Sequence, residues 1–461
     1  MNDLALAPTD SRRYFYAMLK ISNWNNYPIV NARMQSFGQV EQAQELIASN
    51  EHTIARGMGR SYKNASLYSH ITSELHHNSI THFDESTGWV TCHAGVLLKE
   101  LLDVFVPRGW FLPVTPGTKF VSVSGAIAAD VHGKNHHKDG SFCLHVEAMT
   151  LALANGEIVT CSRHERCDLF ELTCGGMGLT DIILDATIQL RSIETAYIRE
   201  EIIEATDLAT IMYLFQSSAD WTYSVAWIDC MAKGRQLGRS LMMRGEHATI
   251  HELPHPDQKT SPLTLPLKHT FSVPFNFPTF ILNGMSVSAF NRIYYHKHAG
   301  GRIRRVVDYN TFFYPLDFVH HWNRIYGGRG FLQYQLVLPE STSYDGIVEI
   351  LRRISRRRWG SFLAVLKLFG KQDSLLSFPM EGYTLALDFP LRDGLFQFLD
   401  ELDTIVTRNG GRIYLAKDAR MKKDIFYEGY PRAQEFIHSL RQWNPDFKFR
   451  SNLTERLGIT L

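Results

Sequence analysis

Titratable side chains gather in the string His132-Gly133-Lys134-Asn135-His136-His137. Just before it, Pro116-Gly117-Thr118 and Val123-Ser124-Gly125-Ala126-Ile127-Ala128-Ala129 hold small and turn-forming residues in place of an ordinary core pattern. Such residues let a backbone approach a flat ligand closely, and their N–H groups can bind phosphate or ring carbonyl oxygens. The segment therefore predicts a cofactor cradle with imidazole and ammonium groups at one end.

Two more glycine-rich turns follow predicted strands. Ala55-Arg56-Gly57-Met58-Gly59-Arg60-Ser61-Tyr62 can wrap a diphosphate with backbone N–H groups and one guanidinium, and Gly175-Gly176-Met177-Gly178 is the other turn. The Gly57-x-Gly59 pair lacks the third glycine of a Rossmann fingerprint and a following helix signal, so nicotinamide binding is disfavoured. The Gly-Lys-Ser/Thr of a Walker loop is missing as well. Together the turns indicate one long ligand threaded across a sheet domain.

Four polar residues stand in apolar surroundings later in the chain. Gln333 and Gln335 have the i, i+2 spacing of one strand face, so both could line a cavity. Lys367 and Lys417 are lone cations in apolar strands. Each could snorkel from a sheet edge, or point at a cofactor or an anionic substrate, because a buried lysine needs a partner.

No metal site is expected. His132 and His136 have the i, i+4 spacing of two ligands on a helix, but Gly133 and Asn135 argue against a helix there. No carboxylate or cysteine completes a ligand set.

Composition bounds the class of protein. The 461 residues are too many for one compact core and predict two domains. A net charge of +1 gives no overall attraction to nucleic acid. The six cysteines show no C-x-x-C pair and are expected to be reduced. Residues 1–5 lack the features of a secretory signal, and no apolar run is long enough to span a bilayer. We expect a soluble protein, or one that sits on a membrane surface.

Hydrophobic periodicity predicts an α/β domain over about 22–195. It includes helices over 40–49 and 97–105, and a hairpin around Asn155-Gly156. Beyond 197 the pattern predicts a mixed, mainly antiparallel sheet covered by helices. Its clearest elements are strands over 222–228 and 331–338 and helices over 344–353 and 395–408, and one last helix is expected after 411.

Two segments carry weaker signals. Residues 250–285 hold six of the 17 prolines among apolar residues and predict a mobile, apolar flap. Arg352, Arg353, Arg356, Arg357 and Arg358 form a basic run on a predicted helix. That run is either a solvated face or a docking site for anionic lipid headgroups.

The glycine-rich turns and the HGKNHH string resemble the FAD domain of the vanillyl-alcohol-oxidase (PCMH-type) flavoproteins. Within that superfamily the chain is most similar to the decaprenylphosphoryl-β-D-ribose 2′-oxidases, and the resemblance covers nearly the whole chain. It also rests on the strings Tyr314-Pro315-Leu316-Asp317, Trp322-Asn323-Arg324, Gly330-Phe331-Leu332-Gln333-Tyr334-Gln335, Lys367-Leu368-Phe369-Gly370, Leu376-Ser377-Phe378-Pro379, Asp388-Phe389-Pro390 and Ala416-Lys417-Asp418.

The resemblance implies an α+β, two-domain PCMH-type fold. Residues 1–196 would form the FAD-binding domain, 197–412 the substrate domain with its flap, and 413–461 a tail that completes the first domain. The family oxidises the 2′-hydroxyl of a polyprenyl-phosphoryl-β-D-ribose to a ketone, which a partner short-chain reductase converts to the arabinose epimer used for cell-envelope arabinan. The location it implies is cytoplasmic, or peripheral on the inner membrane.

Carried over by position, the resemblance assigns site residues. FAD would contact 55–65, 121–125 and 129–132, with these named positions: Ala55, Arg56, Gly57, Met58, Gly59, Arg60, Ser61, Tyr62, Gly117, Ser122, Ser124, Gly125, Ala129, His132, Ile183 and Tyr414. The substrate side would be lined by Lys134, Trp227, Tyr314, Gln333, Gln335, Lys367, Phe369 and Ala386, beside Lys417 and His132. Related oxidases bond a histidine of the first glycine loop to the flavin. Tyr62 stands there in this chain, so FAD is expected to be non-covalent.

The chain departs from the family pattern at three places. Ala386 stands where the mycobacterial enzymes carry cysteine, and Thr384 replaces an asparagine, which puts sensitivity to cysteine-directed nitroaromatic inhibitors in doubt. Lys63-Asn64 replaces Gly-Asp after the tyrosine, and Ser124 replaces a glycine.

The implied mechanism transfers hydride from the ribose C2′ to flavin N5 while a base takes the hydroxyl proton. Lys417 or His132 would manage that proton, and Lys134 and Lys367 would bind the sugar or its phosphodiester. The flap would shield the polyprenyl chain. The rival functions are an alditol or aldonolactone oxidase acting on a soluble sugar, a non-catalytic lipid- or sugar-binding protein, and a membrane scaffold built on the arginine run. The electron acceptor, quinone or oxygen, stays open.

Overall fold

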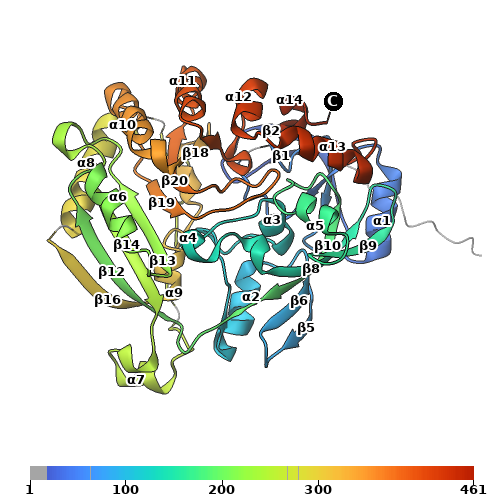
Figure 1. Ribbon diagram of the computed structural model, residues 1–461, viewed down its shortest axis with the longest axis horizontal. Helices are drawn as coiled ribbons and strands as arrows, with labels where there is room; N and C mark the ends of the chain where they lie inside the picture. Colours follow the sequence, from blue (N-terminus) through green and yellow to red (C-terminus); the bar gives the residue numbers. More distant parts are fainter. Residues whose placement is uncertain (1–17, 63, 267, 279, 299, 461) are drawn as a thin grey trace, which may run out of the picture.

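The computed structural model describes residues 18–460 apart from 63, 267, 279 and 299. Figure 1 shows an α+β architecture, in which sheets from the first part of the chain stand beside a larger sheet from the middle. The fold class expected from the sequence is confirmed.

Two small sheets are built from the N-terminal part. One sheet has the strand order β1 (Leu19–Ser22), β2 (Ile29–Ser36), β4 (His70–Ser73), β3 (Ile54–Arg56), and its last three strands run parallel. The other is antiparallel, in the order β5 (Ile80–Asp84), β6 (Trp89–His93), β10 (Ile182–Gln189), β8 (Val146–Ala152), β9 (Ile158–Ser162). The predicted hairpin at Asn155-Gly156 joins β8 to β9 and is confirmed.

Helices α1 (Val40–Ser49), α2 (Leu98–Phe105), α3 (Val123–Ala128), α4 (His136–Asp139) and α5 (Cys167–Thr173) accompany these two sheets. Helix α2 buries Leu98, Leu101, Leu102 and Phe105, the one-sided spacing of an amphipathic helix. His136 opens the single turn of α4 while His132 precedes it, so the two histidines do not share a helix face.

The middle of the chain folds into one eight-stranded sheet. Every neighbouring pair is antiparallel, so the expectation of a mixed sheet is wrong in that detail. The strand order is β16 (Arg302–Asp308), β12 (Tyr197–Ala205), β14 (Ser240–His247), β13 (Tyr223–Ile228), β19 (Ala364–Phe369), β20 (Gly382–Pro390), β18 (Phe331–Pro339), β21 (Arg412–Ile413). The helices that pack on it include α6 (Leu208–Gln216), α10 (Glu340–Arg357) and α11 (Leu395–Arg408).

Strand alternation gives this sheet two different faces. In β18, Leu332, Tyr334 and Leu336 belong to the core beneath the helices, while Gln333 and Gln335 between them face a cavity. The neighbouring strands β19 and β20 repeat the pattern, with leucines in the core and Lys367 and Ala386 on the cavity side. One face of the sheet is therefore structural and the other carries the polar groups.

The chain end returns to the N-terminal sheets. After β21 come a short 3-10 turn, η6 (Leu415–Lys417), and three helices, α12 (Lys423–Gly429), α13 (Ala433–Trp443) and α14 (Asn452–Leu457), where one final helix was expected. Thr53 N donates to Lys448 O at 2.9 Å, and Asn444 Nδ2 donates to Leu179 O at 2.8 Å. The red C-terminal helices of Figure 1 accordingly lie beside the blue start of the chain.

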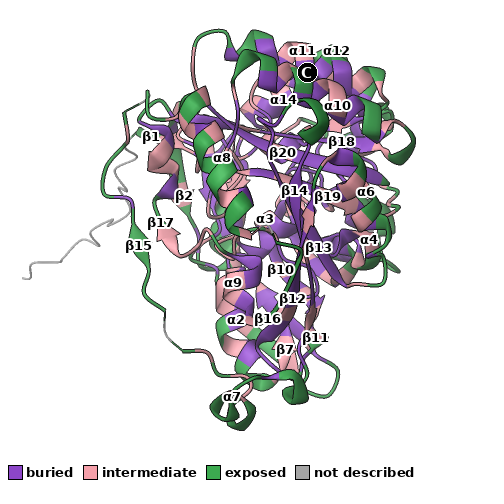
Figure 2. Ribbon diagram, turned by 90° about the vertical axis from the view of Figure 1, so that its left-hand side faces the viewer, coloured by how far each residue is buried: buried purple, intermediate pink, exposed green. Residues whose placement is uncertain are grey.

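The proline-rich segment 250–285 is mostly exposed and contains little regular structure. It includes α7 (Pro256–Thr260) and β15 (Phe271–Ser272), which pairs in parallel with β17 (Val319–His320), and it leads into α8 (Gly284–His298). Figure 2 shows β15 in a long, largely exposed excursion. All six cysteines are free thiols, and no described helix combines the length and apolarity needed to cross a bilayer.

A buried ion cluster joins α11 to the turn before α12, and it generates a stability prediction. Arg420, 6% exposed, pairs with Asp400 and Asp403, and Tyr334 donates to Asp403 at 3.0 Å. Replacing Arg420 with methionine leaves Asp403 buried without its cation, so we expect a loss of about 3 kcal/mol in the free energy of unfolding.

Urea unfolding would measure that loss, with Arg432→Met as the matched control. Arg432 is 39% exposed and pairs only with surface acids, so its loss is expected to cost less than about 1 kcal/mol. Equal losses in the two variants would contradict the prediction.

Candidate active site

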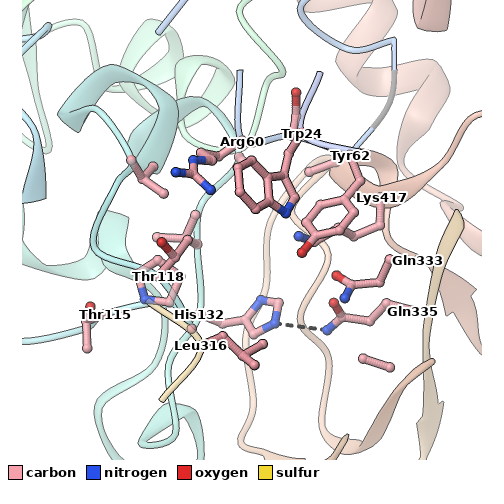
Figure 3. Close-up of a pocket in the computed structure, with 18 of the residues that line it drawn as sticks. Trp24, Arg60, Tyr62, Thr115, Thr118, His132, Leu316, Gln333, Gln335 and Lys417 are labelled. Carbon is pink, nitrogen blue, oxygen red and sulfur yellow. Dashed lines mark hydrogen bonds between the residues drawn. The ribbon is translucent and has the colours of Figure 1, made fainter. Parts of the chain in front are cut away.

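A cavity of about 680 Å³ lies between the N-terminal sheets and the polar face of the eight-stranded sheet. Its lining comes from all three glycine-rich turns, from strands β13, β18, β19 and β20, and from η6. Figure 3 shows Arg60 beside Trp24, Lys417 beside Tyr62, and Gln335 hydrogen-bonded to His132. Segments far apart in the sequence therefore meet at one site.

The glycine-rich wall leaves backbone donors free. The N–H groups of 57–61 donate to no described residue, whereas Tyr62 N donates to Ala416 O at 3.0 Å. Gly59 has a left-handed φ of +62°, and a Cβ on Gly57 would lie 1.9 Å from Ser122 Oγ. A Cβ on Gly117 would meet nothing within 4 Å. The wall is thus an open cradle of N–H donors, suited to an anionic ligand that approaches the backbone closely.

His132 is a neutral imidazole in the middle of the site. Its Nε2 accepts a hydrogen bond from Gln335 Nε2 at 3.0 Å (Figure 3), so its proton resides on Nδ1. Nδ1 is buried and has no partner among the described residues. Burial, reinforced by the nearby positive charge of Lys367, holds the pKa of His132 well below its usual range. The imidazole can therefore donate a hydrogen bond into the cavity.

Three half-buried lysines line the same cavity. Burial lowers the pKa of Lys134 and of Lys417 to about 7 and that of Lys367 to about 8. Lys134 donates to Phe312 O and lies 4.1 Å from the centre of that ring. Lys417 Nζ lies 3.6 Å from the centre of the Tyr62 ring and hydrogen-bonds to no described residue. Near neutral pH all three can exchange a proton or pair with an anion.

The surroundings of the two sequence-predicted lysines differ from what was expected. Strand β19 is interior to the sheet, between β13 and β20, so Lys367 does not snorkel from an edge, and that interpretation is wrong. Lys417 lies in the η6 turn and not in a strand. Gln333 is oriented by a hydrogen bond from its Nε2 to Asp388 Oδ1 at 2.8 Å.

Most of the residues assigned from the sequence line this one cavity. On the FAD side they are Ala55, Gly57, Met58, Gly59, Arg60, Ser61, Tyr62, Gly117, Ser122, Ser124, Gly125, Ala129, His132, Ile183 and Tyr414. On the substrate side they are Lys134, Trp227, Gln333, Gln335, Lys367, Ala386 and Lys417. Lys63, the first position of the Lys63-Asn64 departure, lies outside the described residues.

Three assigned residues do not line the cavity. The Arg56 guanidinium turns back to Asn23 and to Ser22 O, which it reaches at 2.9 Å. Tyr314 is fully buried, and its hydroxyl lies 2.6 Å from that of Thr115, which does line the cavity. Phe369 packs behind His132 with ring centres 4.8 Å apart. These side chains support the wall from behind, so the position of a residue in a motif did not reveal the direction of its side chain.

Sequence reasoning also missed residues that line the cavity. Trp24 stacks under Arg60, with the guanidinium carbon 3.9 Å from the ring centre. The others include Glu74, Asp181, Phe290, Tyr294 and Phe362. None of them stands in a glycine-rich or HGKNHH-type string, so only the tertiary structure brings them to the site. Among the described residues of 250–285, none lines the cavity, which leaves the proposed shielding role of that flap without support here.

Comparison with known proteins identifies the cofactor. Residues 29–162 match the family described as FAD binding domain. The chain is 40% identical to decaprenylphosphoryl-β-D-ribose oxidase of Mycolicibacterium smegmatis over 416 aligned residues. These residues make up 88% of this chain and 89% of that protein. The chain is 31% identical to an uncharacterized protein of Streptomyces coelicolor over 79% of this chain and all of that protein. Similarity to L-gulonolactone oxidase of Mus musculus, 30% identity, covers only 24% of this chain and 25% of that enzyme.

The residues present fit FAD. The free N–H groups of 57–61 with Arg60 suit the diphosphate, and the unpartnered Nδ1 of His132 can donate to a ring oxygen or nitrogen. Burial raises the pKa of the Tyr62 phenol far above its usual range, so this side chain stays protonated and is a poor nucleophile. FAD is the cofactor, and the cavity wall explains how the chain holds it.

Tyr62 leads to a prediction about FAD attachment. Because no nucleophilic side chain occupies its place in the glycine loop, we expect acid precipitation of the holoenzyme to release all of the flavin into the supernatant. Absorbance of the supernatant and of the redissolved pellet near 450 nm would measure the split. Yellow colour that stays with the pellet after extensive washing would contradict a non-covalent cofactor.

Proposed function

Because the chain belongs to the same family as decaprenylphosphoryl-β-D-ribose oxidase, an FAD-dependent oxidoreductase family, we propose that it oxidises the 2′-hydroxyl of a polyprenyl-phosphoryl-β-D-ribose to the 2′-ketone. The observation that carries the proposal is that Lys417, Gln335 and His132 line the same cavity as the glycine-rich turns. FAD supplies the acceptor for the hydride that leaves C2′. We further propose that a partner short-chain reductase reduces this ketone in the next step.

Lys417 is the better placed of the two candidate bases. Its amine has a pKa of about 7 and no hydrogen bond to a described residue, so above that pH it offers a free lone pair. The Nε2 lone pair of His132 is already engaged by Gln335, and the imidazole binds a proton only well below neutral pH. We therefore assign proton removal from the 2′-hydroxyl to Lys417, and a hydrogen bond from Nδ1–H to His132.

Lys134 and Lys367 suit the phosphodiester of the same substrate. Each is a half-buried cation on the cavity wall, and no ion pair joins it to a carboxylate of the described residues. An incoming phosphate would raise their pKa values and hold them charged, because burial of a charge is stabilised by an opposite charge.

The rival functions explain less of the sequence similarity and less of the cavity lining. Likeness to an L-gulonolactone oxidase is confined to about a quarter of the chain, whereas likeness to the ribose oxidase extends over most of it. Trp227, Phe290, Tyr294 and Phe362 add an apolar wall that a small soluble sugar does not need. A binding protein without catalysis has no use for a lysine held near neutral pH beside a flavin site.

The assignment of Lys417 generates a pH prediction. Since a lowered pKa means that the amine is protonated below about pH 7, kcat/KM should fall about tenfold for each pH unit below that value. Lys417→Met should lower kcat by roughly 10²–10⁴-fold while the protein keeps its FAD.

Stopped-flow reduction of the flavin under anaerobic conditions would measure these rates. Lys134→Met is the matched control, because it removes a lysine of similar pKa that we assign to binding, so its main effect should be on KM. A Lys417→Met enzyme with near-normal reduction rates would rule out Lys417 as the base.

An exposed apolar surface next to the cavity suits access to a lipid-linked substrate. Phe280, Ile281, Met285, Phe290 and Ile293 form this surface, called here the lipid face; Met285 is 77% and Phe280 74% exposed. Phe290 also lines the cavity, so the lipid face leads into the site. Exposed Arg292 and Lys297 on α8 supply cations for anionic headgroups. Helix α8 stands at the surface in Figure 2.

The arginine run at 352–358 is less suited to membrane contact. Arg353 and Arg357 of this run pair with Glu401 of α11 at 3.5 and 3.0 Å, so part of its charge is already neutralised within the chain. We propose that contact with the membrane is peripheral and uses the lipid face.

Vesicle binding tests this proposal. Replacing both Met285 and Ile293 with serine should lower co-sedimentation of the holoenzyme with phosphatidylglycerol vesicles at least tenfold. The variant lacks two exposed apolar side chains that would insert into the bilayer. Tyr213→Ser, which removes another side chain that is 70% exposed, and Arg356→Glu should leave binding unchanged. Loss of binding in Arg356→Glu with none in the serine pair would assign docking to the arginine run instead.

A further inference from the structure

Of the three carboxylic acids buried in the wall of the FAD cavity, Glu200 is paired with Arg305, and the other two have no cation partner among the described residues. Glu74, which follows β4, is 2% exposed, and Asp181, which precedes β10, is 1% exposed. Both line the cavity and belong to the N-terminal part of the fold, where Glu74 contacts Ser124 beside Gly125. Neither acid belongs to the groups that would hold the diphosphate or the substrate.

Neither acid has the partner that a buried carboxylate normally requires. No ion pair joins Glu74 or Asp181 to any described cation. Arg56 is a neighbour of Glu74, whose backbone N–H donates to Arg56 O, but the Arg56 guanidinium donates to Asn23 and to Ser22 O instead. The Ser124 hydroxyl donates to Glu74 Oε2, and Thr173 Oγ1 donates to Asp181 Oδ2 at 2.9 Å. Asp181 Oδ1 is buried and has no partner among the described residues.

The two acids differ in their protonation. Burial raises the pKa of Glu74 to about 8, and the negative charge of Asp181 adds to the shift. Burial raises the pKa of Asp181 to about 6. At neutral pH the wall therefore holds a neutral Glu74 beside an ionised Asp181. Because Ser124 occupies Oε2, the proton of Glu74 belongs on Oε1, and the pair presents one donor and one free acceptor.

This arrangement selects one part of FAD. The diphosphate is excluded, because an ionised carboxylate would repel it. The isoalloxazine is excluded, because it must face the substrate beside Lys417 and His132. The adenosine end remains, and adenine carries the matching pattern, an acceptor at N1 and a donor at the N6 amino group. We propose that Glu74 and Asp181 bind the adenosine end of FAD, with Glu74 donating and Asp181 accepting a hydrogen bond.

The inference rests on FAD as cofactor and not on the ribose substrate, so it stands or falls separately from the proposed reaction. Its readout is the affinity of the full-length apoprotein for FAD, measured by quenching of flavin fluorescence between pH 6.5 and 9. Lys134, Lys367 and Lys417 also line the cavity and lose charge in this range. The informative quantity is therefore the difference between the parent protein and Glu74→Gln, whose amide donates but cannot ionise.

We expect the FAD affinity of the parent to fall about tenfold per pH unit above pH 8, beyond any slope that Glu74→Gln shares with it. Asp181→Asn removes the charge that disfavours ionisation of Glu74, so the loss of affinity should begin at a lower pH. Parallel curves for the parent and Glu74→Gln would overturn the role of Glu74, since the lysines alone would then explain the pH dependence.

A second measurement tests the adenosine assignment. Glu74→Leu should weaken FAD about ten- to hundredfold and weaken ADP, measured by competition, by the same factor. An unchanged ADP affinity beside a weakened FAD affinity would overturn the assignment. The rise in melting temperature on adding FAD separates binding from folding. If the Glu74 carboxyl were purely structural, its loss would lower the melting temperatures of the apoprotein and the holoprotein equally. Asp403→Asn, a buried acid with a pKa of about 6 away from the cavity, is the control and should leave the FAD affinity unchanged.

Discussion

The cost of removing ammonium groups from water without giving them a carboxylate partner is the main physical constraint on this site. Lys367 and Lys417 are held against a cavity wall where desolvation, not ion pairing, sets their protonation. Such an arrangement persists only where a ligand supplies the missing charge or uses the free lone pair. The fold directs both ammonium groups into one cavity, and their lowered pKa values allow proton exchange near neutral pH.

The eight-stranded sheet achieves this by strand alternation. Leucines on one face pack under α10 and α11, and the intervening positions, Gln333, Gln335 and Lys367, are forced into the cavity. The same geometry fixes the hydrogen bond from Gln335 that leaves His132 neutral with its proton on Nδ1. The glycine turns add Arg60, and the segment after β4 adds the buried Glu74, to the lining of the same cavity.

Much of the fold could be predicted from local patterns. The helix over 40–49, the Asn155-Gly156 hairpin and the strand carrying Gln333 and Gln335 all appear where periodicity and turn chemistry placed them. The directions in which side chains point were harder to predict from the sequence. Arg56, Tyr314 and Phe369 stand inside or beside informative strings yet point away from the cavity, because each finds a partner contributed by a distant segment. The interior position of β19, which changes the meaning of Lys367, likewise depends on strand order, which no local pattern encodes.

By itself the sequence determined that glycine-rich turns would form a cradle and that a few cations and amides would stand in apolar strands, since backbone freedom and alternation are local properties. The tertiary structure decided which polar groups share the cavity, which of Lys417 and His132 keeps a free lone pair, and that Glu74 and Asp181 belong to the same wall. Protonation depends on burial and on neighbouring charges, and both arise only when segments remote in the chain pack against one another.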